Sequence, residues 1–356
     1  MKVTDVIAES LHERGVDHVF GLTGGAVVHL FDSVCNRPDM KAIFTHHEQA
    51  ASFACAAYGR VRDGVGVGMF TTGPGGTNAL TGLAGAWVDS IASVFISGQA
   101  RREHLSRSTG TRQVGTQELD ILAMAEPVTK RAAMLQEPED ILYELDLAFH
   151  TATTGRPGPV WLDIPLNLQW ANVDKEKLHR FTPSKEAAKA PDLSTVSRMI
   201  REAKRPLLVM GSGLQNDMAR SAARKSVAAL GIPYVVTFRS FGAWPHSDPM
   251  NLGVLGIAGN RGGNLAVYNA DLIVAVGNHL PMPQTGGQFQ SWAPNAKRVV
   301  VNIDEKQLAF ETVRIDEKIH MDAGAFFEAM NEEFKGARIE WDKRWLELVP
   351  LWRAAS

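Results

Sequence analysis

Residues 65–78 read VGVGMFTTGPGGTN and carry the clearest fold signal in this sequence. The first part, Val65–Thr71, consists of small and branched residues and predicts a buried strand. The glycines and the proline of residues 73–76 then break the strand, and a helix is expected to follow as far as Val88. Because a strand that passes through a short glycine turn into a helix is the repeating unit of parallel sheets, this stretch predicts an α/β fold.

The same alternation of strand and helix extends over the first 170 residues. Short apolar strands are also expected at five other places, over residues 17–21, 42–45, 93–97, 128–134 and 160–164. Helices are expected between them, over residues 4–15 with Thr4 as the cap, 26–35, 47–61 and 138–153. This alternation predicts a parallel sheet that is covered by helices on both faces.

A second α/β unit is expected after a linker. Residues 171–192 are rich in Lys, Glu, Ala and Pro and predict that linker. Further strands are expected over residues 206–210, 234–237, 271–276 and 298–303, and the last stretch, 325–351, is mostly helical in pattern. The sequence therefore predicts two doubly wound parallel-sheet domains, over residues 1–170 and 193–335, with a helical tail over 336–356.

Composition excludes several classes of protein. The chain has 356 residues, of which 45% are hydrophobic and 21% charged, which excludes wholesale disorder. The net charge of −2 gives no basic field for nucleic acid or for an anionic membrane. No run of 18 apolar residues occurs, so no membrane partner is expected. The two cysteines cannot build a disulfide framework, and we expect a cytoplasmic location.

A candidate catalytic carboxyl lies where an expected strand meets an Ala-rich helix. The segment Thr45–Ala51 reads THHEQAA, which places Glu48 at this junction. One interpretation is that partial desolvation lets Glu48 exchange a proton near neutral pH. The other is that Glu48 only complements the helix dipole, and spacing alone favours this second interpretation. A metalloprotease is excluded, because Ala51 stands where the second histidine of His-Glu-x-x-His would be.

Two glycine-rich segments follow expected strands in the same way. They are residues 21–25, GLTGG, and residues 72–78, TGPGGTN. Each either lets a ligand approach the backbone or makes a tight structural turn. The second is not a Walker phosphate loop, because the Lys-Ser/Thr pair is missing. Since open parallel sheets bind ligands at the carboxyl ends of their strands, the coincidence of these segments with Glu48 favours a binding site.

Together these segments resemble a known enzyme superfamily. The resemblance rests on five motifs in order: VFGLTGGA at 19–26, THHEQAA at 45–51, TGPGGTN at 72–78, ISGQ at 96–99 and GRPGPVWLDIP at 155–165. They resemble thiamine diphosphate enzymes of the acetolactate synthase-like (acetohydroxyacid synthase, pyruvate decarboxylase) superfamily. The resemblance covers residues 1–170 and continues through 191–335. It implies a pyrimidine-binding domain followed by a Rossmann-like central domain.

The resemblance also implies roles for individual residues. Glu48 matches the glutamate that hydrogen-bonds the aminopyrimidine ring of thiamine diphosphate and so promotes proton removal from carbon 2 of the thiazolium. Gln117 and Gly25 match positions close to the substrate, although Thr116 stands where the synthases have Phe. The cofactor-binding positions that this implies are Gly24, Gly25, Glu48, Thr72, Gly73, Pro74, Gly75 and Asn78.

Two departures concern cofactors. The superfamily holds the diphosphate and Mg²⁺ through a Gly-Asp-Gly…Asn signature in a third domain, which is absent from these 356 residues. We therefore expect no metal ligands in this chain, and a third domain that is either supplied by a separate polypeptide or lost by truncation. Gly256–Gly259 resembles the flavin-contacting loop of acetolactate synthases, whereas residues 278–283, NHLPMP, replace a charged stretch downstream. The sequence therefore leaves FAD binding open.

The expected activity is that of a carboligase or decarboxylase acting on a 2-oxo acid such as pyruvate, inactive without the missing domain. Two alternatives stay open: a relative that transfers the two-carbon unit to a keto-sugar, and a non-catalytic interaction or regulatory module. The polar stretch 101–117 carries four arginines and is either a solvated loop or a substrate-entry segment. Expected partners are the small-molecule 2-oxo acid, further copies in a homo-oligomer, and a separate chain carrying the diphosphate-binding domain.

Overall fold

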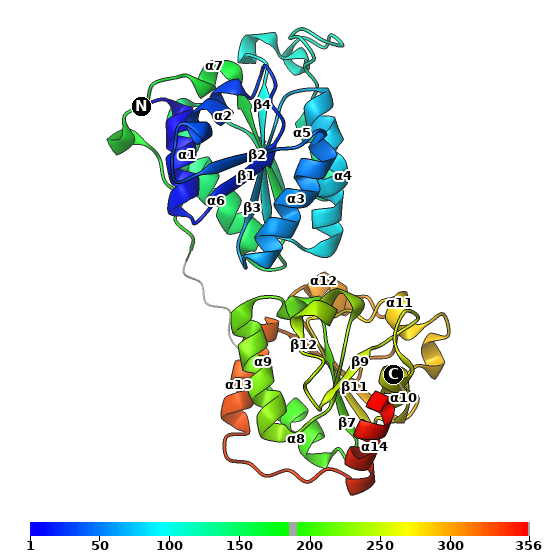
Figure 1. Cartoon of the computed structure of the whole chain (residues 1–356). Coiled ribbons are helices and arrows are strands. Elements are labelled where there is room, and N and C mark those ends of the chain that lie inside the picture. The colour runs from blue at the N-terminus through cyan, green and yellow to red at the C-terminus, as the bar shows by residue number, and fades with distance from the viewer. Residues whose placement is uncertain (185–190, 355–356) are drawn as a thin grey trace. The chain divides into compact units, whose positions relative to one another are not determined.

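A computed structural model describes residues 1–184 and 191–354 of the chain. The chain divides into two compact units, unit 1 from Met1 to Glu186 and unit 2 from Ala187 to Ser356. Each unit contains one six-stranded sheet, and all neighbouring strands run parallel. The prediction of two parallel-sheet α/β units is therefore confirmed (Figure 1).

In unit 1 the strands lie in the order β2-β1-β3-β4-β6-β5. Their bounds are β1 (His18–Gly21), β2 (Lys41–Phe44), β3 (Gly66–Phe70), β4 (Ser93–Gln99), β5 (Arg131–Met134) and β6 (Pro159–Pro165). The central strands β3, β4 and β6 are buried along their whole length. Because both faces of such strands are covered, their sequences are nearly continuous runs of apolar residues.

Helices cover both faces of the unit 1 sheet (Figure 1). One face carries α1 (Val3–Glu13), α2 (Val28–Cys35) and α6 (Ile141–Thr153), with the short α7 (Leu166–Gln169) beside them. The other carries α3 (Glu48–Val61), α4 (Pro74–Asp89) and α5 (Ile121–Ala125). Each face has its own apolar core. Beneath α3 and α4, the rings of Phe70, Phe95 and Trp161 stack across β3, β4 and β6.

The first helix begins earlier than the sequence predicts. Lys2, not Thr4, is the N-cap of α1, and its backbone N–H donates to the Asp5 carboxylate over 3.3 Å. Thr4 is buried inside the helix and accepts a hydrogen bond from Ser33 at 2.8 Å. The prediction was wrong because a threonine can satisfy a cap or a buried polar contact, and its sequence position does not distinguish the two.

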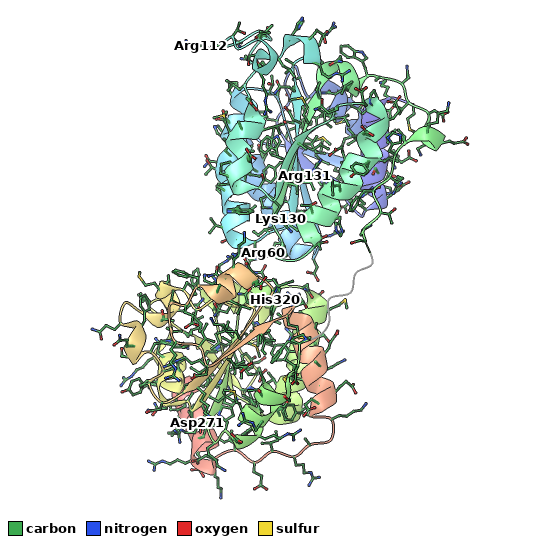
Figure 2. The ribbon with its side chains drawn as sticks, turned by 180° about the vertical axis from the view of Figure 1, so that it is seen from behind. Arg60, Arg112, Lys130, Arg131, Asp271 and His320 are labelled. Carbon is green, nitrogen blue, oxygen red and sulfur yellow. The ribbon has the colours of Figure 1, made fainter. Side chains whose placement is uncertain are left out.

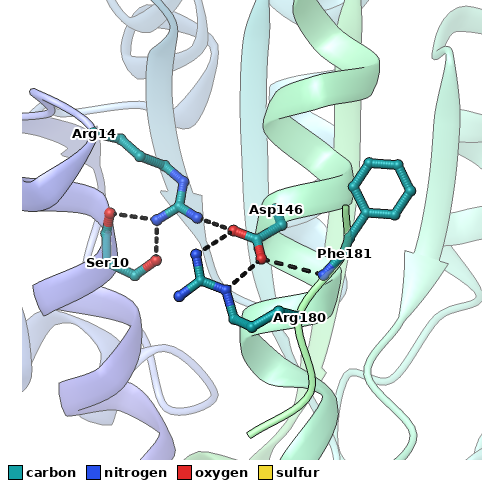
Figure 3. Close-up of polar contacts among 5 residues, drawn as sticks. All are labelled: Ser10, Arg14, Asp146, Arg180 and Phe181. Carbon is teal, nitrogen blue, oxygen red and sulfur yellow. Dashed lines mark hydrogen bonds and ion pairs between the residues drawn. The ribbon is translucent and has the colours of Figure 1, made fainter. Parts of the chain in front are cut away.

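Part of the expected linker, residues 171–192, packs against unit 1. Val173 and Leu178 are buried in the core beneath α1 and α6. Figure 3 shows Asp146 of α6 accepting hydrogen bonds from Arg14, from the Arg180 side chain and from the backbone N–H of Phe181. The stretch from 171 to 184 is therefore fastened to unit 1, while residues 185–190 lie outside the described part of the chain.

Unit 2 has the strand order β12-β11-β10-β7-β8-β9. Its strands are β7 (Pro206–Met210), β8 (Tyr234–Val236), β9 (Asn251–Val254), β10 (Leu272–Val276), β11 (Lys297–Asn302) and β12 (Glu317–His320). Four of these match predicted strands. The two that sequence reasoning missed, β9 and β12, are the edges of the sheet. Edge strands are short and partly polar, and in β12 only Ile319 is buried, so the apolar run is absent.

The helices of unit 2 also form two layers (Figure 1). One layer consists of α8 (Ser194–Glu202), α9 (Asp217–Leu230) and α13 (Ala323–Glu333), and the other contains α10 (Arg261–Asn269) and α14 (Lys343–Ala354). The short helices α11 (Met282–Thr285) and α12 (Glu305–Ala309) follow β10 and β11. The helical tail expected over 325–351 is interrupted between α13 and α14. Across residues 1–184 and 191–354, the helices are all too short or too polar to cross a membrane.

Candidate functional site

The candidate residues gather at one edge of the unit 1 sheet. Gly24 and Gly25 follow β1, Glu48 follows β2, Thr72–Asn78 follows β3, and Gln117 lies in the segment after β4. Since β2, β1, β3 and β4 are consecutive neighbours and parallel, their carboxyl ends adjoin. The structure therefore brings together the segments that the sequence singled out.

Glu48 is the first residue of α3 and is only 7% exposed. The preceding residue, His47, caps the helix, because its Nδ1 accepts a hydrogen bond from the backbone N–H of Gln49 at 3.1 Å. The Glu48 carboxylate accepts a hydrogen bond over 3.0 Å from the side-chain amide of Asn78, which belongs to α4. His47 thus serves as the cap, and the Glu48 carboxylate is held at the junction of two helices.

The glycines of the segment after β3 allow close packing. Gly73 has φ +62°, and a Cβ atom there would lie 2.1 Å from the carbonyl oxygen of Gln117. A Cβ at Gly75 would lie 2.5 Å from the Thr71 side chain and 3.4 Å from a Glu48 carboxylate oxygen. Pro74 then starts α4 with its fixed φ. These glycines let the first turn of α4 approach Glu48 closely.

The segment after β1 contains two glycines with different surroundings. A Cβ at Gly24 would lie 2.6 Å from Thr71, so this glycine is required for packing. Thr71 also contacts the end of this segment, because its hydroxyl accepts a hydrogen bond from the backbone N–H of Ala26 at 3.3 Å. Gly25 is exposed, and a Cβ there would meet no described atom within 4 Å. Gly25 therefore leaves open space beside the site, as a ligand-facing position would.

Gln117 is exposed and has φ +59°, a conformation that non-glycine residues seldom adopt. Its carbonyl faces Gly73, so the backbone is held in this conformation by the neighbouring segment. The next residue, Glu118, is 2% exposed and accepts hydrogen bonds from the hydroxyl and the backbone N–H of Ser106 at 2.9 and 3.1 Å. Sequence reasoning did not single out Glu118, which fixes the arginine-containing stretch.

Most of the arginines in that stretch have partners. Arg101, Arg102 and Arg107 form ion pairs with Glu103, Glu137 and Asp120 respectively. Arg112 is exposed. Figure 2 shows it at one end of unit 1, whereas Arg60 and Lys130 lie at the other end. All four arginines are thus on the surface of this segment, and three of them are paired with carboxylates.

A buried polar cluster next to the site lies within two of the motifs quoted above, although sequence reasoning gave its residues no role. Ser97, Gln99 and Asp163 are each at most 1% exposed, although they lie within strands β4 and β6. The available signal was a polar residue in an otherwise apolar buried strand. Burial raises the pKa of Asp163 to about 7, against the lowering effect of hydrogen bonds from Ser97 and Gln99.

Two parts of the sequence match models of one enzyme family. Residues 1–124 match the thiamine pyrophosphate enzyme N-terminal TPP binding domain, and residues 193–330 match the central domain of the same enzymes. The first match includes all of the candidate site residues. The chain belongs to the thiamine pyrophosphate enzyme family.

Several curated members of the thiamine pyrophosphate enzyme family are similar along nearly the whole chain. The acetolactate synthase large subunit of Corynebacterium glutamicum is 34% identical over 342 residues, which is 94% of this chain and 53% of that protein. The probable acetolactate synthase large subunit of Methanocaldococcus jannaschii is 31% identical over 360 residues, or 98% and 59%. The acetolactate synthase isozyme 3 large subunit of Escherichia coli K12 is 30% identical over 361 residues, or 98% and 61%. The chain thus spans about half to three-fifths of the length of these relatives.

The site fits one half of the family's cofactor better than the other. For the pyrimidine ring it offers a buried carboxyl, Glu48, with one oxygen held by Asn78, and open space beside Gly25. For a metal-bound diphosphate, the described residues contain no group of three or more His, Cys, Asp or Glu side chains that could hold a metal ion. The described residues thus offer a hydrogen-bonding carboxyl that suits a pyrimidine ring.

Proposed function

We propose that this chain forms the pyrimidine-binding and central parts of a thiamine diphosphate-dependent enzyme that decarboxylates a 2-oxo acid such as pyruvate and transfers the two-carbon product to a second carbonyl. The observation that carries the proposal is the buried Glu48 carboxyl, oriented by Asn78 at the edge of a parallel sheet. The acetolactate synthase relatives support the reaction class.

The proposed roles follow from the chemistry of the side chains. Bound thiamine diphosphate supplies the carbon nucleophile and the electron sink for decarboxylation. Glu48 holds and exchanges a proton at the ring nitrogen of the pyrimidine, a step that is faster when the carboxyl is positioned in advance. Asn78 orients that carboxyl, because its amide donates to one of the two oxygens. Gly25 has no side chain and leaves space beside the site, and the exposed Gln117 side chain would contact the substrate.

We further propose that the diphosphate and Mg²⁺ are held by a polypeptide segment outside these 356 residues, and that the chain acts in an oligomer. Exposed apolar side chains on unit 1 support the association. They include Phe44 at the carboxyl end of β2, where the site lies, Phe53 in the middle of α3, and Trp87 and Val88 at the C-terminal end of α4, away from the site, which are 47%, 48%, 40% and 68% exposed. Exposed apolar groups gathered on neighbouring elements mark an interaction surface. Sedimentation that shows only monomers, alone and with a diphosphate-binding polypeptide, would contradict this association.

FAD is a second proposed cofactor, to be tested separately. Gly256 has φ +97° and its segment packs against Pro283, where a Cβ would lie 2.3 Å from the carbonyl oxygen. Gly211 and Gly213 pack against the backbone of Gly277, so these glycines also serve the contact between two strand ends. The absorbance spectrum of the purified protein distinguishes a bound flavin from a purely structural use of these glycines.

The test of the proposed function is proton exchange at carbon 2 of thiamine diphosphate, followed by NMR. The protein is supplemented with a polypeptide that carries the Gly-Asp-Gly…Asn signature. We expect Glu48→Gln to slow exchange about 10²–10⁴-fold, because the amide cannot exchange the proton. Glu305→Gln is the matched control, since Glu305 is also the first residue of a helix but lies in unit 2. Equal exchange in wild type and Glu48→Gln would support a purely structural carboxyl, and absence of exchange in wild type would support a non-catalytic module.

A further inference from the structure

Two neighbouring strands of unit 1 carry polar side chains into the interior. Ser97 and Gln99 lie on β4, and Asp163 lies on β6, where it is paired in register with Ser97. Side chains two residues apart on a strand share a face, so these three lie on the same face of the sheet as the stacked rings of Phe95 and Trp161. Burying a carboxyl, an amide and a hydroxyl in the centre of a sheet costs free energy unless each group is hydrogen-bonded, so each of them requires partners within the sheet or beside it.

The Gln99 side chain uses every hydrogen-bonding position of its amide. Oε1 accepts from the Thr72 hydroxyl at 2.6 Å and from the backbone N–H of Ala100 at 2.9 Å. Nε2 donates to the backbone carbonyl of Leu119 and to the Asp163 carboxylate, both at 3.0 Å. An amide has two N–H groups and two acceptor positions, so Gln99 is fully paired. Rotating the amide by 180° would break the contacts with Ala100, Leu119 and Asp163, and only the Thr72 hydroxyl could bond either orientation.

Asp163 fixes the direction of that amide. One carboxylate oxygen accepts from Gln99, and the other accepts from the Ser97 hydroxyl at 2.5 Å. The Ser97 oxygen in turn accepts from the indole N–H of Trp161 at 2.7 Å. An ionised carboxylate can only accept, so it selects the orientation in which the Gln99 amide nitrogen points inward. The Gln99 carbonyl oxygen then necessarily faces Thr72.

The two outer ends of this network lie in the segments that carry the proposed site. Thr72 directly precedes Gly73, and Leu119 lies two residues after Gln117. These two segments also touch each other, because the Gln117 carbonyl occupies the space beside the Cα of Gly73. Gln99 therefore ties both segments to the same buried strand.

We infer that Gln99 and Asp163 are positioning residues of the thiamine diphosphate site: Gln99 fastens residues 72–78 and 117–119 to β4, and Asp163 orients the Gln99 amide. This inference rests on the proposed function. Gln99 acts through Thr72 and Leu119, and Asp163 acts through Gln99. The arrangement holds the start of α4, and with it Asn78 and Glu48, in one geometry before any ligand binds.

The two oxygens of Asp163 face different partners, Ser97 and Gln99. A proton on the oxygen that faces Ser97 leaves the other oxygen an acceptor for the Gln99 amide, so both protonation states can orient that amide. The carboxyl is desolvated by burial, faces the hydrogen-bond donors Ser97 and Gln99 on β4, and feels the negative charges of Asp120 and Glu118 in the segment before α5. Its pKa of about 7 lets both forms be populated near neutral pH.

Hydrogen exchange measured by mass spectrometry on the full cofactor-free chain tests the inference. Gln99→Met keeps the length of the side chain and removes all four contacts, and we expect about tenfold faster exchange in both 72–78 and 117–122. Thr72→Val removes one contact and should affect only 72–78. Ser33→Ala is the matched control, because Ser33 is also buried and hydrogen-bonded in unit 1 but contacts Thr4 and Asp5. If Gln99→Met fails to fold, Asp163→Leu, which removes the acceptor that faces Gln99, replaces it and should give the same two-segment effect.

A positioning role requires that the two segments respond together in Gln99→Met. Unchanged exchange in either segment of Gln99→Met would overturn the inference. Calorimetry with thiamine diphosphate and Mg²⁺ then addresses the proposed function separately. Faster exchange in both segments of a chain that binds no cofactor, even with a diphosphate-binding polypeptide, would refute that function and leave the fastening of the segments established.

Discussion

The side-chain amide of Asn78 lies 3.0 Å from a carboxylate oxygen of Glu48, so α3 and α4 share a polar contact near their N-terminal ends. The two residues follow different strands, β2 and β3, which are separated in the sheet by β1. The contact therefore exists only because Gly75 lets α4 approach, and it sets the direction of the carboxylate.

Replacing Asn78 should disorient Glu48 without disrupting the fold. In Asn78→Leu the side chain keeps its size but loses the donor, and a hydrogen bond to a charged group contributes about 1.5–3 kcal/mol. We expect thiamine diphosphate affinity, measured by calorimetry with the complete set of polypeptides, to fall about tenfold. Thr77→Val is the control, because the Thr77 hydroxyl bonds only within its own helix turn, to Pro74. Equal losses in the two variants would show that disturbance of α4, and not the Glu48 contact, is responsible.

Gly73→Ala should destabilise the fold far more than Gly155→Ala, although the two glycines have similar φ. Gly73 and Gly155 have φ of +62° and +66°, but only at Gly73 would the new Cβ meet an atom, the Gln117 carbonyl at 2.1 Å. Backbone strain alone costs roughly 1 kcal/mol in either variant. Urea unfolding should show an additional loss for Gly73→Ala of about 1–3 kcal/mol from the clash. Similar losses in both would mean that the segment containing Gln117 moves aside freely.

The stability of unit 1 should depend on pH through Asp163. Its pKa rises from 3.8 to about 7 on folding, because burial outweighs the hydrogen bonds from Ser97 and Gln99. The folded chain thus keeps a proton that the unfolded chain releases above pH 4, so this contribution to stability is present at low pH and is lost as the pH rises through 7. As the pH rises from 5 to 7, the free energy of unfolding of the wild type should fall, relative to that of Asp163→Asn, by up to about 1.4 kcal/mol per pH unit. Urea unfolding with exchange detection in β4 and β6 measures it, and a constant difference would contradict the assignment.

Asp146→Asn should release the segment that follows α7. The Asp146 carboxylate joins Arg14 of the segment after α1 to Arg180 and to the backbone of Phe181 (Figure 3). Neutralising it leaves two guanidinium groups without their shared partner, and we expect a loss of about 2 kcal/mol in unit 1 stability. Limited proteolysis should show faster cleavage within 179–184. Asp174→Asn, which removes an exposed ion pair with Lys177, should cleave as wild type does. Unchanged cleavage in Asp146→Asn would show that the buried Val173 and Leu178 suffice to hold the segment.

The central strands could be predicted from the sequence, whereas the edges could not. Pro206–Met210 is apolar throughout because it is covered on both faces, and its bounds match the sequence prediction. Residues 317–320, EKIH, bury only Ile319, so nothing in the local pattern marks them as a strand. Their pairing with β11 depends on the position of the whole sheet, which is not encoded locally.

The candidate site shows the same division. Glu48 and the glycine segments could be placed together from sequence, because parallel strands deliver their carboxyl ends to one edge. The partnership of Gln99 with Asp163 could not, because it requires knowing that β4 and β6 are neighbours although β5 lies between them in the sequence. The left-handed backbone of Gln117 was equally unpredictable, since a contact with Gly73 holds it there.

The contact between Gly73 and the Gln117 carbonyl also limits how this fold can be recombined. A chimera that takes residues 71–78 from one family member and residues 115–119 from another would join two surfaces that were shaped separately. If Gly73 is kept but the backbone that faces it differs, an unfilled space would remain beside the start of α4. If a bulkier residue stands at 73, the two segments could not pack against each other. The two segments therefore form a single unit of inheritance, and loop exchange between relatives should transfer both or neither.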